Sequence, residues 1–382
     1  MAATKDSAPW PMIKLGDICT ITIGKTPARK NESYWGEGFP WLSIKDMNQG
    51  RYLSETSEKI TQAAVNETNP RLCESGTVVF SFKLSIGKVG ITTVPMYTNE
   101  AIAAFVPKER ADLDRNFLYH ALRWTGRNAG GADAVMGKTL NKKTLSGLEI
   151  PLPPLDEQRR IAEILDNSSR NLDRIRKLLD LLSLVTDAYR SDIAGATRKP
   201  VKEVLRIRSG TVQPTDEANL DLLHVAPNNL ASGSDFLFGV RTAAEDGVTS
   251  NKYKFEEGDI LYSKIRPYLN KVCRAPFGGI CSADMYALVP NQPELGPWIV
   301  SELRSPRFLA YAERASGRAS IPKINRKSLL GFEIEIPSEA VLAEFNTLDA
   351  KVEKLRNDVM RKFRISDELH KSLSTRAFQG EL

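Results

Sequence analysis

Short apolar runs bounded by turn-forming residues recur through the first part of the chain, and each predicts a β-strand. The clearest is Thr77–Phe82, a β-branched and aromatic run entered through the turn Glu74–Gly76. One helix is expected after them, because an Asp at position 112 or 114 precedes apolar residues at helical spacing. The remaining members of these two patterns are the strands Ile18–Ile23, Trp41–Ile44, Val89–Thr93, Ala101–Val106 and Leu148–Leu152 and the helix residues Phe117, Leu118, Ala121 and Leu122.

The same pattern returns about 184 residues further along the chain. Lys138–Pro153 and Pro322–Pro337 are identical at seven of sixteen aligned positions, and Glu74–Ser81 matches Glu256–Ser263 in the same way. A helix matching that of the first half is expected over about Pro297–Ala315. These matches predict two similar heads of α+β (mixed α/β) composition. Neither head shows the regular strand–helix alternation of a parallel sheet.

Each head is followed by a long segment with helical periodicity. Between Leu155 and Ile193, apolar residues recur in steps of four and three, which is the heptad seam of a coiled coil. A less regular seam runs from Leu348 to Leu373. Because two similar helices follow two similar heads, we expect the helices to pair with each other. At ~1.5 Å per residue, the first would be roughly 58 Å long.

Charge is distributed unevenly between the heads and the helices. The 382-residue chain carries a net charge of +6, yet Leu155–Arg198 and Ser338–Leu382 each contain eight basic and eight acidic residues. The excess therefore lies in the heads, which favours a polyanionic partner there, although a generic basic surface is the alternative.

Composition excludes several other classes of protein. The sequence has no apolar run of the ~18 residues that a membrane span needs, and its N-terminus lacks the apolar core of a signal peptide. Four cysteines without Cys-x-x-Cys spacing and three scattered histidines favour neither a zinc site nor a disulfide framework. We expect a cytoplasmic protein with reduced cysteines.

Catalytic motifs are missing. The sequence has neither an Asn/Asp-Pro-Pro-aromatic motif of amino-methyltransferases nor a Gly-x-Gly-x-x-Gly fingerprint. Gly131–Gly137 has five residues between its glycines where a phosphate-binding loop needs four. The one acidic-x-Lys triplet, Asp349–Lys351, is better explained by a solvated helix face. His120, His224 and His370 have no evident nucleophile nearby, so each is interpreted as a surface or satisfied core histidine. We therefore predict a binding protein, not an enzyme, with no cofactor of its own.

Several motifs carry a resemblance to a known family. These are Gly24–Pro27, Tyr34–Gly36, Phe39–Asp46, Gly76–Ser81 and, above all, the proline–Glu–Gln junction Pro153–Leu165. With the order head–helix–head–helix, they make the chain similar over its whole length to the specificity subunits of type I restriction–modification systems. The second junction departs from the pattern, since Ser338–Glu344 lacks the Glu–Gln pair.

The resemblance implies a domain organisation and a function. It implies two target recognition domains, separated by two antiparallel helices that form a coiled coil, with an approximate two-fold internal repeat. The expected bounds are 1–153 for the first domain, 154–198 for the central helix, 199–337 for the second domain and 338–382 for the C-terminal helix. Such a subunit reads a bipartite, asymmetric double-stranded DNA target, one half per domain. It performs no chemistry and assembles with two methyltransferase subunits and with restriction subunits.

Basic residues in the loops of the heads are the candidate DNA contacts, because lysine and arginine bind phosphates and read base edges. The predicted set is Lys25, Arg29, Lys45, Lys83, Lys88 and Lys138 in the first head, and Arg241, Lys264, Arg266, Lys271, Arg318 and Lys323 in the second. Lys83 and Arg266 rank highest, since they follow matching strands. The resemblance assigns partner binding to Glu157, Gln158, Ile161 and Leu165. A coiled-coil scaffold that binds proteins through its heads is the alternative function.

Overall fold

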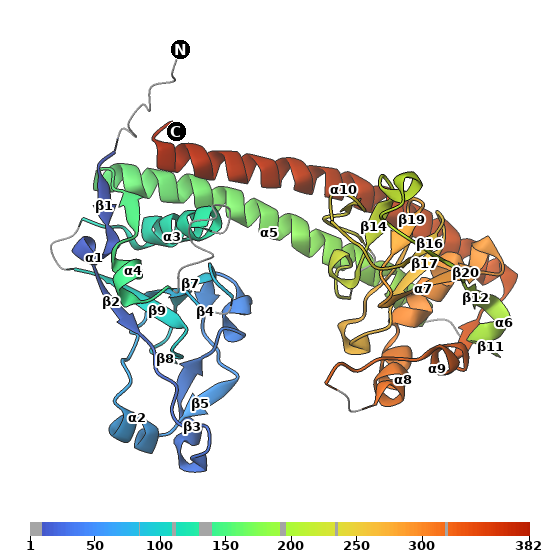
Figure 1. The fold of residues 1–382 in the computed structure, drawn as a ribbon, viewed down its shortest axis with the longest axis horizontal. Helices are drawn as coiled ribbons and strands as arrows, with labels where there is room; N and C mark the ends of the chain where they lie inside the picture. Colours follow the sequence, from blue (N-terminus) through green and yellow to red (C-terminus); the bar gives the residue numbers. More distant parts are fainter. Residues whose placement is uncertain are drawn as a thin grey trace. The chain divides into compact units, whose positions relative to one another are not determined.

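The structure is a computed structural model that describes residues 10–83, 85–108, 112–129, 140–191, 196–233, 236–317 and 320–382. The chain forms two compact units (Figure 1). The first comprises Met1–Asp173 and Arg364–Leu382, and the second comprises Arg174–Phe363. Each unit therefore combines one head with part of both long helices. No helix in the described ranges is both long enough and apolar enough to cross a membrane.

The first head is built on a five-stranded sheet of order β2-β9-β6-β7-β4. A three-stranded sheet of order β5-β3-β8 and the antiparallel pair β1-β10 complete it. Its strands are β1 Met12–Lys14, β2 Cys19–Ile23, β3 Trp35–Leu42, β4 Tyr52–Leu53, β5 Glu58–Ile60, β6 Val78–Ser81, β7 Val89–Thr92, β8 Tyr97–Thr98, β9 Ile102–Pro107 and β10 Glu149–Pro151. Its helices are α1 Leu15–Ile18, η1 Glu32–Tyr34, η2 Asp46–Gln49, α2 Gln62–Thr68, α3 Arg115–Ala129 and α4 Lys142–Ser146.

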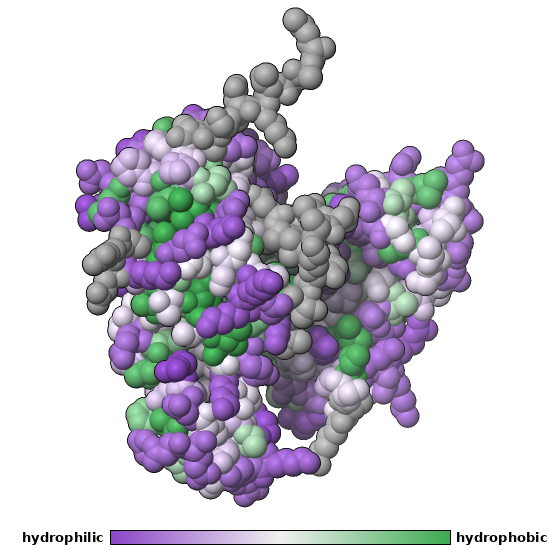
Figure 2. All heavy atoms as spheres, turned by 60° about the vertical axis from the view of Figure 1, so that its left-hand side comes forward, coloured by the Kyte–Doolittle hydropathy of each residue, from purple (hydrophilic) through white to green (hydrophobic). Residues whose placement is uncertain are grey.

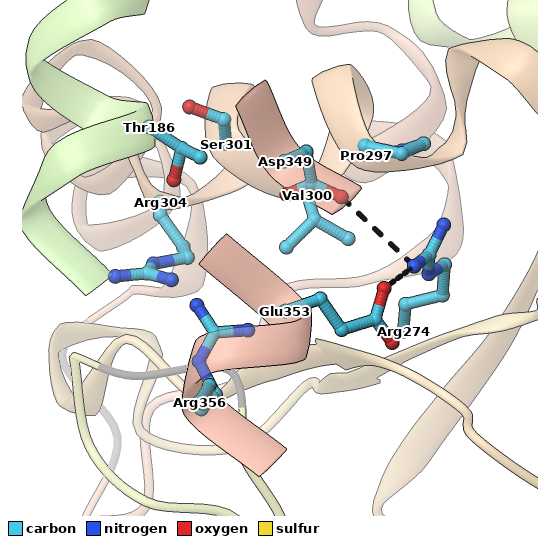
Figure 3. Close-up of a pocket in the computed structure, with 9 residues that line it drawn as sticks. All are labelled: Thr186, Arg274, Pro297, Val300, Ser301, Arg304, Asp349, Glu353 and Arg356. Carbon is cyan, nitrogen blue, oxygen red and sulfur yellow. Dashed lines mark hydrogen bonds and ion pairs between the residues drawn. The ribbon is translucent and has the colours of Figure 1, made fainter. Parts of the chain in front are cut away.

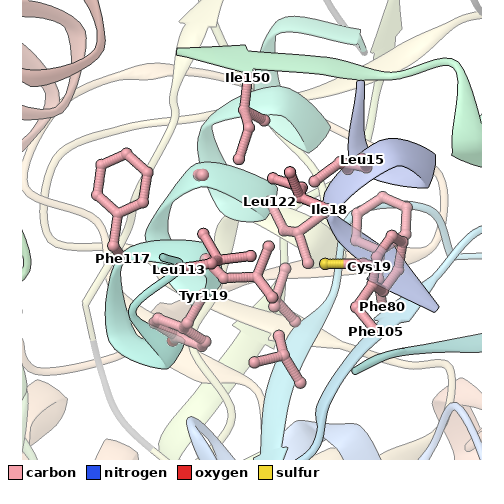
Figure 4. Packing of buried hydrophobic residues seen from close by; sticks show 14 of the residues in the cluster. Leu15, Ile18, Cys19, Phe80, Phe105, Leu113, Phe117, Tyr119, Leu122 and Ile150 are labelled. Carbon is pink, nitrogen blue, oxygen red and sulfur yellow. The ribbon is translucent and has the colours of Figure 1, made fainter. Parts of the chain in front are cut away.

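The core of the first unit joins segments that are far apart in the sequence (Figure 4). Apolar residues of β6 and β9, among them Phe80 and Phe105, pack with the buried face of α3, which includes Phe117 and Leu122. The predicted strands and helix of this head are thereby confirmed, with bounds that shift by a few residues. Phe378, near the C-terminus, is buried in the same cluster.

The second head repeats this architecture. Its four-stranded sheet has the order β12-β20-β17-β18, and a five-stranded sheet has the order β13-β16-β19-β14-β15, with β11-β21 as a separate pair. Its strands are β11 Thr197–Pro200, β12 Leu205–Ile207, β13 Thr211–Val212, β14 Leu223–Val225, β15 Arg241–Thr242, β16 Lys252–Phe255, β17 Ile260–Ser263, β18 Val272–Arg274, β19 Gly279–Cys281, β20 Met285–Pro290 and β21 Glu333–Ile336. Its helices are α6 Val201–Val204, η3 Glu217–Asn219, η4 Pro227–Asn229, η5 Pro267–Leu269, η6 Pro293–Leu295, α7 Gly296–Arg304, α8 Pro306–Ser316 and α9 Arg326–Leu330.

Strand order confirms the internal repeat that the sequence predicted. The series β12-β20-β17-β18 corresponds to β2-β9-β6-β7, and the parallel pair β14-β19 corresponds to the parallel pair β3-β8. The matched asparagines also correspond, because Asn141 and Asn325 each cap a short helix. The side chain of Asn141 accepts from the Thr144 amide at 3.1 Å, and that of Asn325 accepts from the Ser328 amide at 2.8 Å.

One predicted helix of the second head is wrong in extent. The expected single helix over Pro297–Ala315 is two helices, α7 and α8, which meet at Ser305. Pro306 lacks an amide hydrogen and disfavours helical dihedrals in the residue before it, so Ser305 is extended (ψ 148°). The Ser305 hydroxyl then caps α8 by accepting from the Phe308 amide at 3.1 Å.

The long helices are α5 Leu155–Ser191 and α10 Glu339–Gln379, and they run antiparallel within each unit. In the first unit, the Arg160 guanidinium donates to the Leu382 carbonyl at 2.7 Å and the Asn171 amide donates to the Ser366 hydroxyl at 3.2 Å. In the second unit, the Tyr189 hydroxyl donates to the Glu344 carboxylate at 2.9 Å. The seam of the second unit buries Leu179, Leu182, Val352 and Val359. The heptad prediction is therefore confirmed for α5. In α10 it is wrong for Leu355 and Leu369, which are 49% and 55% exposed.

Candidate nucleic-acid interface

A hairpin loop joins two antiparallel strands of the main sheet at the same place in each head. Residues 82–88 connect β6 to β7, and residues 264–271 connect β17 to β18. These are the loops in which the sequence ranked Lys83 and Arg266 highest. Both side chains are exposed.

The loop 264–271 is held rigidly by the rest of the second head. The Arg266 amide donates to the Pro322 carbonyl at 2.7 Å, and the Lys271 ammonium donates to the Pro227 carbonyl at 2.6 Å. The Asn270 side chain donates to the Arg304 carbonyl at 3.2 Å. Arg266 and Asn270 both have a φ of 48°, a left-handed conformation that asparagine adopts readily but that is disfavoured for a residue such as arginine.

Basic side chains gather around this loop. Burial lowers the pKa of the Lys264 amine, and the neighbouring charges of Lys323 and Arg326 lower it further, whereas Asp284 opposes them. Burial also lowers the pKa of Lys271, and the charge of Arg266 adds to the effect. The structure thus brings together four of the six predicted cations of the second head: Lys264, Arg266, Lys271 and Lys323. Sequence reasoning missed Arg326, although it aligns with Lys142 in the internal repeat.

Not all of these cations are free to meet DNA. Lys264 is only 8% exposed, with its ammonium 5.1 Å from the centre of the Tyr286 ring. Lys271 is held by the Pro227 carbonyl, and in the first head Lys88 donates to the Ile44 carbonyl at 3.0 Å. These two lysines occupy equivalent places, and each ties the second strand of its hairpin to a turn. The exposed cations of the second cluster are Arg266, Lys323 and Arg326.

The predicted cations of the first head form two groups. Lys45, Lys83 and Lys88 surround the hairpin loop, since Lys88 also donates to the Asn48 side chain at 2.7 Å, three residues after Lys45. Lys25 and Arg29 lie instead beside Trp41, whose indole donates to the Lys25 carbonyl at 3.1 Å.

The members of the second group, and Arg241 of the second head, have partners within the chain. The Lys25 ammonium donates to the Thr68 carbonyl at 2.6 Å, and Arg29 pairs with Glu58 and lies 3.8 Å from the centre of the Trp35 ring. Arg241 pairs with Asp246 at 2.9 Å. The predicted contacts Lys138 and Arg318 lie outside the described residues.

The junction between the first head and α5 is buried. The Gln158 side chain is fully buried; it donates to the carbonyls of Asp112 and Pro153 at 2.8 Å each, and it accepts from the Asp114 amide at 2.8 Å. Ile161 and Leu165 are 1% and 0% exposed in the core of the first unit.

Glu157 is the one predicted partner-binding residue that remains accessible, with 22% of its side chain exposed and an ion pair to Arg160 at 2.7 Å. That arginine lowers the pKa of the Glu157 carboxyl. Of the four predicted residues, a partner could therefore reach only Glu157 without opening the core.

A cluster of charged side chains, the charged joint, lies where the head of the second unit meets the long helices (Figure 3). Asp349, which aligns with Leu165 in the repeat, lies in a small pocket of about 40 Å³ together with Arg274, Arg304 and Glu353. Arg274 pairs with Glu353, and its distance to Asp349 is 3.9 Å. The interpretation of Asp349 as part of a solvated helix face is therefore wrong, because its side chain is only 16% exposed. Arg356 also lines the pocket, and Arg304 pairs with Asp187 of α5 at 3.2 Å, so these charged groups form a structural network.

The histidines have structural surroundings. Buried His120 lies 2.5 Å from the Asp166 carboxylate, and burial lowers its pKa. His224 pairs with Asp246 at 2.8 Å, and His370 is 4% exposed against α5. Among the described residues, no group of three or more His, Cys, Asp or Glu side chains could hold a metal ion.

Apolar side chains are also exposed on the long helices. On α5, Leu178, Leu181 and Leu184 are 42%, 50% and 56% exposed, and on α10 Leu355 is 49% exposed. Figure 2 shows hydrophobic residues interspersed with hydrophilic ones on the face of the molecule that it draws. Within the second unit, these side chains lie outside the buried seam of the two helices.

The known proteins that this chain resembles, in sequence and in structure, include specificity subunits of type I restriction–modification systems. Residues 8–183 match the type I restriction modification DNA specificity domain. The whole chain is 26% identical to the specificity subunit of the type I restriction enzyme EcoDI from Escherichia coli, over 90% of that protein. It is 30% identical to the MjaIX specificity subunit from Methanocaldococcus jannaschii over 46% of this chain and 42% of that one. A crystal structure of the S subunit of a type I restriction–modification system from M. genitalium superposes with a TM-score of 0.51 at 14% identity, covering 99% of this chain and 98% of that one.

Proposed function

Because this chain belongs to the family of type I restriction–modification specificity subunits, we propose that it reads a bipartite, asymmetric DNA sequence, one half-site per head. Specificity subunits are the non-catalytic members of their complexes, so the chain supplies recognition and not chemistry. The recognition domains proposed are residues 1–153 and 199–337, joined by helices over 154–198 and 338–382.

The repeated hairpin loop supports this proposal most directly. Each head presents an exposed cation, Lys83 or Arg266, after the same strand of the same sheet. Around Arg266, the exposed Lys323 and Arg326 extend a surface suited to phosphate groups. The loop sequences differ, KLSIGK after Phe82 against KIRPYLNK after Ser263, so the two half-sites should differ as well.

The long helices are proposed to set the spacing and to carry the partner subunits. With 37 residues, α5 has a length of roughly 55 Å, which exceeds the ~34–36 Å between half-sites one turn apart on B-DNA. The exposed leucines of α5 offer an apolar surface outside the seam. We propose that two modification subunits dock there and near Glu157, and that restriction subunits join through them. S-adenosylmethionine and ATP would be held by those partners.

Binding of duplex DNA by the purified chain should depend strongly on salt. Each phosphate contact contributes roughly −0.9 to the slope of log K against log salt concentration. We expect Arg266→Ala and Lys323→Ala each to make this slope shallower by about one contact. Arg198→Ala is the matched control, because Arg198 is exposed but pairs with Glu335 away from the loop. Fluorescence anisotropy at several salt concentrations provides the measurement. A flat affinity from low to physiological salt would contradict DNA binding and favour the protein scaffold.

A further inference from the structure

An aromatic side chain stands at the tip of the rigid loop in the second head. Tyr268 is 50% exposed and lies in η5, which begins directly after Arg266. A single exposed apolar residue is common on protein surfaces and carries no meaning by itself. Here, however, the loop that presents the ring is both strained and surrounded by cations.

Strain in this loop points to a function for its tip. A left-handed conformation is disfavoured for an arginine, and such residues persist where the surroundings over-determine them. Arg266 and Asn270, which flank η5, both have this conformation. Three hydrogen bonds fix the two ends of the loop: from the Arg266 amide, from the Asn270 side chain and from the Gly233 amide to the Asn270 carbonyl at 3.0 Å. The ring of Tyr268 is thus presented at a fixed place, and little conformational entropy is lost when it makes a contact.

The surrounding cations can position the head on the DNA backbone, but they cannot distinguish one base sequence from another. Arg266, Lys323 and Arg326 are exposed around the loop, and phosphate contacts by such residues carry no sequence information. Sequence is read by contacts with the bases, and an apolar side chain can touch a thymine methyl group or wedge against a base step. A ring in a loop that also carries the exposed cation Arg266 is placed for such a contact. Ile321, also 50% exposed, lies beside Pro322, which the loop contacts through Arg266.

The first head has a similar arrangement. Ile86, in the equivalent hairpin loop, is 52% exposed and follows the exposed Lys83. The first loop has a positive φ at Gly87 (93°), whereas the second loop has positive φ at Arg266 and Asn270 (48° each). Each head therefore presents one cation and one large apolar side chain from the same hairpin.

From these observations we infer that Tyr268 is a specificity-determining residue that makes an apolar contact with a DNA base in the half-site of the second head. The inference rests on the proposed DNA-binding function. It assigns to the ring a role different from that of the cations, because an apolar contact releases no counterions.

The test uses the full chain in complex with its modification subunits. The probes are a duplex carrying the target mapped for the wild-type complex and the same duplex with the second half-site scrambled. Tyr268→Ala should reduce the preference for the intact target about 10-fold or more, since stacking or apolar base contacts are worth ~1–3 kcal/mol. Its salt slope should equal that of the wild type. Arg266→Ala, in contrast, should make the slope shallower by about 0.9.

Two further variants separate recognition from folding. Tyr268→Phe keeps the ring and should retain the wild-type preference. Ile86→Ala should relax the first half-site and leave discrimination at the second unchanged. All variants should melt at the wild-type temperature, because the side chains are half exposed.

Unchanged discrimination in Tyr268→Ala, or a salt slope as shallow as that of Arg266→Ala, would overturn the role of the ring. Loss of discrimination in Tyr268→Phe would also overturn it, since the hydroxyl and not the ring would then be the contact. If the wild-type complex itself showed no preference for the intact duplex, the proposed function would fail, not the assignment of Tyr268 alone.

Discussion

Replacing Phe378 with alanine is expected to destabilise the first unit by about 3–5 kcal/mol, which is typical of a large aromatic residue removed from a core. Phe378 lies near the C-terminus but is only 2% exposed within the core of the first head. Its ring centre is 5.6 Å from that of Phe117 and 5.2 Å from that of Trp124, both on α3. The last turns of α10 therefore complete a core that begins near residue 15.

Hydrogen exchange followed by mass spectrometry can measure this effect, because it reports on both units in one sample. Peptides of β6 and α3 should lose protection in Phe378→Ala, whereas peptides of β17 should not. Leu369→Ala is the control on the same helix, since Leu369 is 55% exposed. Equal protection in the two variants would show that α10 does not pack on the first head.

A second large effect is expected for Glu302→Ala, which should destabilise the second unit by about 3–5 kcal/mol. Glu302 is fully buried, and its carboxylate accepts from Arg190 at 2.9 Å and from Arg307 at 2.7 Å. Arg190 belongs to α5 and Glu302 to α7, so the ion pair joins the head to the helix within this unit. Removing one member of a buried ion pair leaves the other charge uncompensated.

The matched control is Asp358→Ala, because Asp358 pairs with Arg361 on the exposed surface of α10 at 3.2 Å. An exposed pair of this kind contributes about 0–1 kcal/mol. Urea denaturation of both variants, followed by pulsed hydrogen exchange in peptides of α7, gives the comparison. A Glu302→Ala midpoint no lower than that of Asp358→Ala would mean that the ion pair does not hold the head to α5.

The strands and helices that the sequence predicted correctly can be recognised from the residue pattern within a single segment. The strand Thr77–Phe82 appears as β6, and the seam residues Leu172, Leu179 and Leu182 are buried as the heptad spacing requires. The internal repeat strengthened these predictions because each head confirmed the other. The helix break at Pro306 was also readable, since a proline in a helical pattern commonly ends the helix.

The features that the sequence did not predict depend on contacts between distant segments. Lys88 looks like any loop lysine, and only the fold shows that it binds the Ile44 carbonyl. Gln158 is polar and follows a proline pair, yet three hydrogen bonds within the chain bury it. The sequence did contain a sign of the charged joint, because the internal repeat aligns the acidic Asp349 with the apolar Leu165. An acidic residue that takes the place of a buried leucine requires a basic partner, which is Arg274 here.

The central claim is that the heads read the bases and the helices set their separation, and methylome mapping tests it most directly. The chain is co-expressed with its modification subunits, and methylated positions are mapped by long-read sequencing. The comparison variant carries one extra heptad in each long helix, inserted at Arg176 and Phe363, whose guanidinium and ring lie 5.4 Å apart. Seven residues add ~10 Å, or about three base pairs. We predict a bipartite target whose two halves stay the same while the spacer between them lengthens. A change in the bases read, or an unchanged spacer, would contradict this division of roles.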